Sequence, residues 1–117
     1  AVKELNLPHQ APLRFAKYVI REEENFAMVK VKFDHVPTLP MLVEAAAQSS
    51  AAFSEDENKM GFLVSLKNVK LFKKPTALEY DVKVTLERRL EKFNYFDFEI
   101  YNNNILFATG AFIISVA

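Results

Sequence analysis

The sequence has no cysteine and no tryptophan, and only two of its 117 residues are glycine. The absence of cysteine excludes disulfide bridges, thiolate metal sites and a cysteine nucleophile, and it favours a reducing compartment, so we expect a cytoplasmic protein. Net charge is also absent, because 15 acidic residues balance 15 basic ones. Since no basic stripe runs along the chain, we expect no nucleic-acid partner.

Long hydrophobic runs are missing as well. No apolar stretch reaches the roughly 18 residues that a membrane-spanning helix requires, and the N-terminus does not have the pattern of a signal peptide, so we expect no membrane partner. No repeat, low-complexity tract or linker divides the chain, which predicts one domain over residues 1–117. Half of the residues are hydrophobic and 11 are phenylalanine, enough to fill a core and to line a cavity or an interface.

One segment, residues 40–53, is typical of a buried helix. It starts with Pro40, which suits a first helical turn, and continues with many alanines, the best helix formers. Because the segment is nearly apolar all round, we expect it to be covered on most sides. The other regular segments are typical of strands, as in the alternation of apolar and polar residues over 27–33. The predicted strands cover residues 15–20, 27–33, 61–67, 68–72, 79–89, 93–101 and 105–116.

The C-terminal strands define the expected architecture. Three asparagines at 102–104 predict a hairpin turn, because asparagine tolerates positive φ. Residues 105–116 are apolar on both faces, which predicts a central strand covered on both sides. One long helix followed by an antiparallel meander indicates an α+β fold in which the sheet curls round the helix, the hotdog arrangement. Its exposed edges favour a dimer in which two copies pair edge to edge.

Glu44 and Gln48 are the informative polar residues of the predicted helix. They stand four residues apart, on one face of an otherwise apolar segment. Either this face meets solvent or an ion-pair partner, or the carboxyl lies in apolar surroundings, where desolvation lets a carboxyl hold a proton and donate it. In the second interpretation Gln48 orients the carboxyl or the substrate.

His35 is the candidate general base, since imidazole titrates near neutrality. It stands nine residues before Glu44, in a proline-containing segment that leads into the helix. The alternative is an ordinary loop histidine, and that interpretation applies more strongly to His9.

Three motifs resemble those of the 3-hydroxyacyl-acyl-carrier-protein dehydratases. The segment Leu7–Leu13 is similar to their Leu-Pro-His-Arg-X-Pro-Phe opening, and Val43–Gln48 is similar to their helix motif Leu-Glu-Ala-X-Ala-Gln. The segment Lys70–Pro75 resembles their Ala-Arg-Phe-Arg-Arg-Pro. The motifs occur in the same order as in that family and extend over nearly the whole chain.

The resemblance implies a hotdog dimer with two composite sites, each using a histidine from one chain and a glutamate from the other. His35 then removes the α-proton of a 3-hydroxyacyl thioester, and Glu44 protonates the departing β-hydroxyl. Amides at the helix start, near Pro40 and Met41, polarise the thioester carbonyl. The thioester belongs to acyl-carrier protein or coenzyme A, and the reaction needs no metal or other cofactor.

A basic segment completes the implied site. Phe72, Lys73 and Lys74, together with Lys70, resemble the basic run at the mouth of the family's substrate tunnel. An acidic carrier protein or a phosphopantetheine phosphate would dock there. The alternative for these lysines is a solvated strand end.

The chain departs from the family ahead of the helix, where its loop is shorter and contains no glycine. Matching residues 35–38 to the family's His-Phe-Pro-Gly keeps the histidine and removes five residues of the loop. Matching residues 33–40 to the later part of the loop instead removes two residues of the family's loop. In that match Lys32 stands at the position of the family's histidine. We favour the first match. Two alternative functions remain: a non-catalytic acyl-binding subunit of a heterodimer, and an acyl thioesterase.

Overall fold

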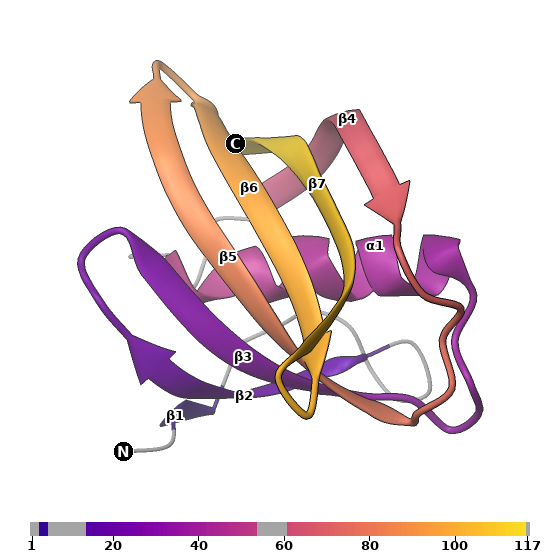
Figure 1. Ribbon diagram of the computed structural model, residues 1–117. Helices are drawn as coiled ribbons and strands as arrows, with labels where there is room; N and C mark the ends of the chain where they lie inside the picture. Colours follow the sequence, from indigo (N-terminus) through magenta and orange to yellow (C-terminus); the bar gives the residue numbers. More distant parts are fainter. Residues whose placement is uncertain (1–2, 5–13, 54–60, 117) are drawn as a thin grey trace.

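A computed structural model describes residues 3–4, 14–53 and 61–116 of the chain. In this part, one antiparallel sheet curves round one α-helix (Figure 1), with the strand order β1-β2-β3-β5-β6-β7-β4. No helix in it is long and apolar enough to cross a membrane. The elements are β1 (Lys3–Glu4), β2 (Ala16–Glu22), β3 (Phe26–Lys32), α1 (Leu39–Ser49), the 3-10 turn η1 (Ser50–Phe53), β4 (Gly61–Leu71), β5 (Glu79–Leu90), β6 (Phe93–Asn102) and β7 (Ile105–Val116).

The predicted helix is present, but its last turn is not α-helical. Proline occupies the first turn as expected, and the α-helix ends at Ser49 before continuing as η1. The hydroxyl of Ser49 donates to the carbonyl of Ala45 at 2.7 Å, and that of Ser50 donates to Ala47 at 2.6 Å. Serine hydroxyls that bond back to helix carbonyls compete with the α-helical pattern, which accounts for the tighter final turn.

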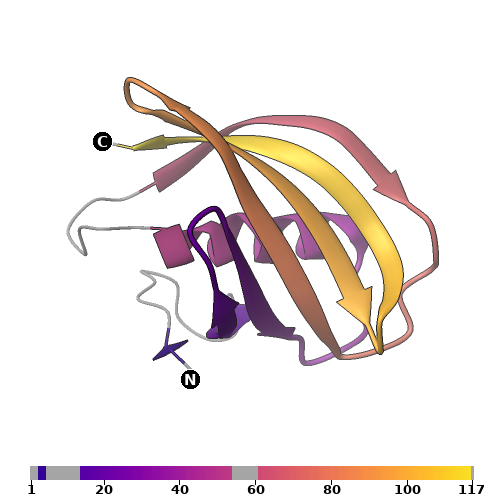
Figure 2. The same ribbon diagram turned by 60° about the vertical axis from the view of Figure 1, so that its left-hand side comes forward.

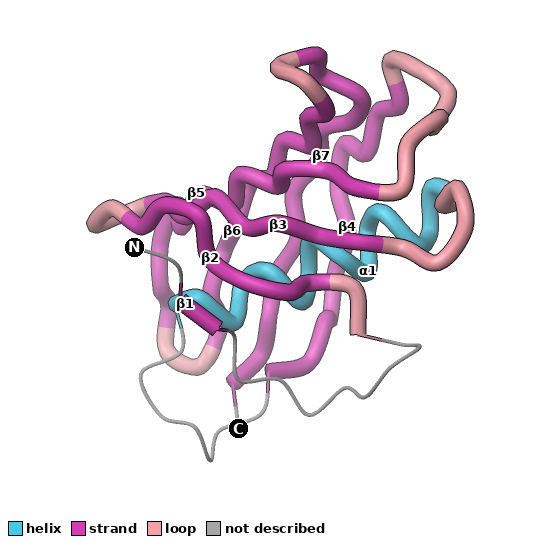
Figure 3. Tube along the Cα trace, turned by 90° about the horizontal axis from the view of Figure 1, so that it is seen from below, coloured by secondary structure: helices cyan, strands magenta, loops and turns pink. Residues whose placement is uncertain are grey.

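The helix lies across the concave side of the sheet (Figures 2 and 3) and packs against β2, β5 and β6. Its buried face belongs to the same core cluster as the valines of β3 and β5, together with aromatic side chains of β6 and β7. Phe96 stacks on Phe112 with ring centroids 5.2 Å apart, and Phe53 and Phe98 extend this row at 5.5 and 5.9 Å. The core therefore depends on phenylalanine packing between the end of the helix and the C-terminal strands.

Strand β7 corrects one expectation and the hairpin before it confirms another. Asn103 and Asn104 have φ values of 49° and 64°, as the predicted turn requires. In contrast, β7 is not covered on both faces, because it lies next to the edge strand β4. Its inward residues Phe112 and Ile114 are buried, while the outward Ile113 is only partly covered. Its two apolar faces reflect a core on one side and a sparsely covered sheet surface on the other.

Strand β4 was expected as two pieces and is a single strand. Its pairing with β7 shifts register twice, between Leu63 and Ser65 and between Lys67 and Lys70. Within the second shift Asn68 has a φ of 54°, a conformation that asparagine adopts more readily than most residues. A bulge of this kind breaks the period-two pattern of a strand, and for that reason the sequence pattern divides there.

Gly110 of β7 is required by the aromatic packing. A Cβ placed on Gly110 would lie 2.6 Å from two ring carbons of Phe98 and 3.2 Å from Val69. Because Phe98 is fully buried, we expect Gly110→Ala to lower the free energy of unfolding by about 1–3 kcal/mol through overpacking. Denaturant unfolding measures this change. The matched control is Ala111→Ser on the outward face of the same strand, and equal stability of both variants would contradict the packing argument.

Candidate functional site

Glu44 lies on a partly exposed stripe of α1. The opposite side of the helix, with Leu42, Ala45 and Ala46, is fully buried in the core. Glu44 and Ala47 retain intermediate exposure, as does Met41 at the helix start. Four of the sequence-derived site residues are therefore brought together on one helix, three of them on or beside this stripe: Pro40, Met41, Glu44 and the buried Gln48.

Gln48 connects Glu44 to the beginning of β2. Its side-chain oxygen accepts hydrogen bonds from the backbone N–H groups of Phe15 at 2.8 Å and Ala16 at 3.1 Å. With the oxygen fixed by two donors, the amide nitrogen faces Glu44 and donates to its Oε1 at 3.3 Å. This hydrogen bond gives the Glu44 carboxyl a defined orientation on the helix.

The sequence pattern alone does not identify the Phe15 and Ala16 anchor of Gln48. These residues are separated from Gln48 by 33 and 32 positions, and backbone N–H groups leave no mark on residue type. The one signal in the sequence is Gln48 itself, a long polar side chain in a helix that is otherwise nearly apolar. With 3% of its surface exposed, such a group needs buried partners.

His35 is exposed in the connection between β3 and α1. Its Nδ1 lies 3.3 Å from the carbonyl oxygen of Val36, and within the described residues no hydrogen bond joins it to Glu44 of the same chain. Lys32, the residue at the histidine position in the other match, points to the outer face of the sheet. Its ammonium pairs with Glu79 at 3.3 Å. Lys32 and His35 therefore lie in different surroundings, Lys32 on the outer face of the sheet and His35 in the connection that leads to α1.

The basic segment lies at the same end of the molecule as the start of α1 (Figure 1). The connection over residues 72–78 meets the one over 33–38, where the N–H of Phe33 donates to Leu78 at 2.8 Å. Phe72 is 55% exposed, and Lys73 and Lys74 are exposed beside it. Lys73 lies 5.9 Å from the ring centre of Phe107. The structure thus gathers the His35 segment, the helix start and the lysines at one end, while His9 and the motif at 7–13 lie outside the described residues.

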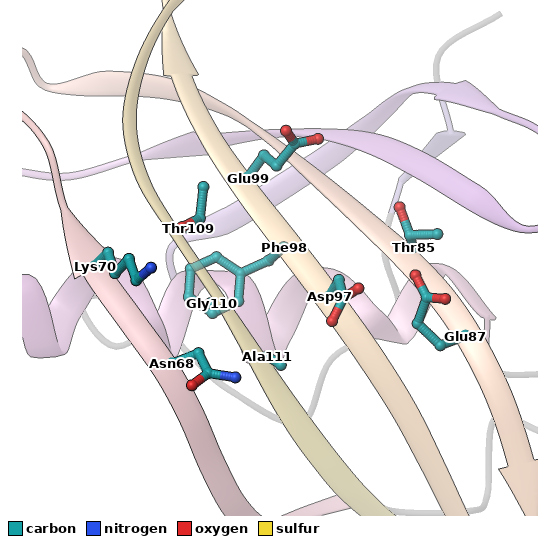
Figure 4. Close-up of a pocket in the computed structure, with 10 residues that line it drawn as sticks. All are labelled: Asn68, Lys70, Thr85, Glu87, Asp97, Phe98, Glu99, Thr109, Gly110 and Ala111. Carbon is teal, nitrogen blue, oxygen red and sulfur yellow. The ribbon is translucent and has the colours of Figure 1, made fainter.

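A separate hollow of about 500 Å³ lies on the outer face of the sheet (Figure 4), away from Glu44. Glu87 of β5 and Asp97 of β6 both contribute to it. The hydrogen bond between their carboxyls, together with the charge of Asp97, raises the pKa of Glu87 above its usual range. The residues that line this hollow are Asn68, Lys70, Thr85, Glu87, Asp97, Phe98, Glu99, Thr109, Gly110 and Ala111.

No family model and no curated protein matches the sequence. Solved structures do match. The dehydratase heterocomplex ApeI:P from Xenorhabdus doucetiae aligns with a TM-score of 0.81 at 19% identity, covering 96% of this chain and 88% of that one. The dehydratase domain from the CurJ module of curacin polyketide synthase aligns with a TM-score of 0.76 at 15% identity. The alignment covers 92% of this chain but only 42% of the CurJ chain.

Thioesterases are similar as well. A hypothetical thioesterase with coenzyme A from Streptococcus pneumoniae TIGR4 aligns with a TM-score of 0.67 at 11% identity, covering 85% of this chain and 84% of that one. The chain therefore has the hotdog fold, with one helix wrapped by an antiparallel sheet. Its structural neighbours are hotdog dehydratases and hotdog thioesterases, and at these identities the likeness establishes the fold.

We expect Gln48→Leu to lower the free energy of unfolding and to loosen the start of β2. Leucine fills a similar volume but leaves the N–H groups of Phe15 and Ala16 without their acceptor, and a buried unsatisfied group costs about 1–3 kcal/mol. Denaturant unfolding measures the total effect, and amide hydrogen exchange should show lost protection at these two residues. Unchanged protection of both amides would contradict the assigned hydrogen bonds.

We expect Asp97→Asn to stabilise the protein at pH 7 but less so towards pH 4. The raised pKa of Glu87 means that the stabilisation from the shared proton is present at low pH and is lost as the pH rises through the folded-state pKa. At neutral pH two carboxylates then repel, and removing one gains at most about 0.5 kcal/mol because both are solvated. Urea unfolding at several pH values tests this, with Asp34→Asn, in an exposed loop, as the charge-matched control. A pH-independent effect would contradict the pairing.

Proposed function

We propose that the protein catalyses the dehydration of a 3-hydroxyacyl thioester, linked to acyl-carrier protein, to the trans-2-enoyl thioester. The observation that carries this proposal is the Glu44 carboxyl, fixed by Gln48 on the partly exposed stripe of a hotdog helix. A carboxyl that is held at one oxygen on a partly exposed face of an otherwise apolar helix is suited to donating a proton to a leaving hydroxyl. Two neighbours of this fold are described as dehydratases.

The reaction needs one base and one acid. His35 removes the α-proton, the C–H electron pair forms the α,β double bond, and the β-carbon–oxygen bond breaks as Glu44 protonates the hydroxyl to give water. Pro40 has no N–H, and the N–H of Leu42 bonds to the carbonyl of Thr38 at 3.1 Å. The N–H groups of Leu39 and Met41 are then the first-turn donors for the thioester carbonyl.

The base and the acid belong to different subunits in this proposal. Within one chain no hydrogen bond joins His35 to Glu44 among the described residues, and Glu44 lies more than one turn into the helix. A second copy that faces the partly exposed stripe would bring its own His35 to this carboxyl. The heterocomplex similar to this chain supports an assembly of two hotdog chains.

The substrate arrives on a carrier. Lys70, Lys73 and Lys74 are exposed, and the last two follow the exposed Phe72 at the end where α1 begins. This combination suits the acidic surface of an acyl-carrier protein or the phosphate of its pantetheine arm. A carrier-linked acyl substrate also favours the cytoplasm, where such carriers are loaded.

A second candidate is a non-catalytic acyl-binding subunit of a heterodimer. The connection over residues 33–38 is short and contains no glycine, and the ring of His35 faces the carbonyl of its neighbour Val36. A chain of this kind would hold an acyl-pantetheine while its partner supplies the chemistry.

Turnover distinguishes these functions. We expect hydration of a short trans-2-enoyl thioester, followed by loss of ultraviolet absorbance, to fall about a hundredfold or more in Glu44→Gln and in His35→Ala. Glu44→Gln keeps the size of the side chain but cannot donate an acidic proton, and we expect Glu44→Ala to remain folded because alanine favours the helix. Lys32→Ala, on the outer face, is the control and should keep full activity.

Three other results would change the assignment. Release of free thiol in place of hydration would identify a thioesterase. Absence of turnover together with protection of a bound acyl-pantetheine would support the binding subunit. Full activity of His35→Ala would show that the base lies elsewhere, and His9 is then the residue to substitute.

A further inference from the structure

Tyr80 is the second residue of β5, which begins directly after the connection over residues 72–78. Its side chain is 1% exposed, and its ring packs edge-on against Phe33 and Phe107, with ring centroids 6.0 and 5.4 Å apart. Its hydroxyl accepts a hydrogen bond from the N–H of Ala77 at 3.0 Å. A phenylalanine ring would make the same ring contacts, so the bond to Ala77 is what the hydroxyl adds.

This one side chain is linked to both ends of the connection over residues 72–78, which is largely exposed. At its start the N–H of Phe72 donates to the carbonyl of Phe107 at 2.8 Å, and the ring of Phe107 packs against Tyr80. Near its end the hydroxyl of Tyr80 holds Ala77. A segment with few buried side chains depends on such fixed points for its position.

The bond to Ala77 also reaches the connection that carries His35. Leu78 follows Ala77 directly, and its carbonyl accepts the N–H of Phe33 at 2.8 Å. Within the described part of the chain, no N–H of residues 34–37 makes a backbone hydrogen bond. The bond between Leu78 and Phe33 is therefore the last backbone anchor before His35, which lies two residues further on.

Phe33 joins the same network to the support of Glu44. Its ring lies 4.9 Å from the ring of Phe15. The N–H of Phe15 donates to Gln48, which in turn donates to the Glu44 carboxyl. Because Tyr80 packs against Phe33 as well, the segment of the candidate base and the support of the candidate acid in one chain share an aromatic contact.

We propose that Tyr80 is a positioning residue of the candidate site. Its hydroxyl fixes Ala77 and, through the adjoining bond of Leu78 to Phe33, sets the position of the connection that carries His35. The hydroxyl touches no substrate and acts only through His35, whose role as the base rests on the proposed function. Since a misplacement of about 1 Å can lower a catalytic rate by up to about a hundredfold, the loss of this bond should be measurable in turnover.

The competing explanation is an ordinary core tyrosine, since a buried hydroxyl requires a partner wherever it lies. Under that explanation Tyr80→Phe lowers the stability of the protein, because the N–H of Ala77 loses its acceptor. It leaves kcat unchanged at temperatures where the variant is folded. The two explanations therefore differ in kinetics and not in stability.

Tyr80→Phe tests the proposal because it keeps the ring and removes only the hydroxyl. We expect kcat for hydration of a short trans-2-enoyl thioester to fall about tenfold, while KM changes little because no substrate contact is lost. The matched control is Tyr101→Phe, which removes a hydroxyl hydrogen bond to Glu99 at 3.0 Å on the outer face and should keep full kcat. Gly110→Ala, which is destabilised by overpacking elsewhere in the core, should also keep it.

Two further measurements separate positioning from a loss of structure. Adding Tyr80→Phe to His35→Ala should slow the enzyme no further, because a residue that acts through the base has no effect once the base is gone. A general loss of structure would lower kcat by the same factor in both backgrounds. Amide hydrogen exchange reads the network without any reaction: protection at Ala77 and at Phe33 should fall in Tyr80→Phe and persist in Tyr101→Phe.

Unchanged kcat in Tyr80→Phe, an equal loss in Gly110→Ala, or the same loss in the His35→Ala background would each overturn the proposal. Lost protection at Ala77 alone would show that the hydroxyl does not reach the His35 connection. If the unmodified protein turns over no thioester, the proposed function fails. The positioning of His35 is then decided by exchange at Phe33 and by the NMR signals of the His35 ring, which should shift in Tyr80→Phe and would refute the proposal if unchanged.

Discussion

The helix covers only part of the concave sheet, and the remaining features of the molecule follow from this mismatch. Helix α1 packs against β2, β5 and β6, while β7 and β4 extend beyond it. The row of phenylalanines that includes Phe96 and Phe112 fills the space at the border of the covered region. Past that row, the helix-side leucines of β4 are exposed and no helix of the described residues lies over them, so the apolar surface of the sheet continues outward from the core.

The same mismatch explains why the polar residues of the helix are divided between two roles. Gln48 points to the covered side, where burial requires that its amide be satisfied, and it joins α1 to the first residues of β2. Glu44, one turn earlier, lies at the boundary between the covered and uncovered sides. Its carboxyl accepts a hydrogen bond from Gln48 and so keeps a defined orientation at the boundary of the covered side.

Much of the fold could be predicted because it depends on local patterns. Alternation identified β3, alanine content and Pro40 identified α1, and the asparagine run identified the turn before β7. Features set by contacts between distant residues were not predictable in the same way. The bulge at Asn68 divided β4 into two predicted pieces, and the place of β7 beside an edge strand could not be read from its two apolar faces.

The candidate site shows the same division between local and distant information. Sequence spacing placed Glu44 and Gln48 on one helix, but their connection to Phe15 and Ala16 bridges more than 30 residues. His35 was identified by residue type and by its position before the helix. In the proposed site its relation to Glu44 depends on a second subunit, and no pattern within one chain encodes the position of a neighbouring copy.

The Glu44–Gln48 pair by itself does not select one reaction. A carboxylic acid can give a proton and a carboxylate can accept one, so the same arrangement would serve elimination from a hydroxyacyl thioester and activation of water against a thioester. Dehydratases and thioesterases both occur among the structural neighbours, as this chemistry would allow. Which of the two reactions takes place depends on the group that faces the carboxyl. Elimination requires a base at the α-carbon, and in this chain the only described histidine is His35, carried on a connection too short to reach far from the helix start.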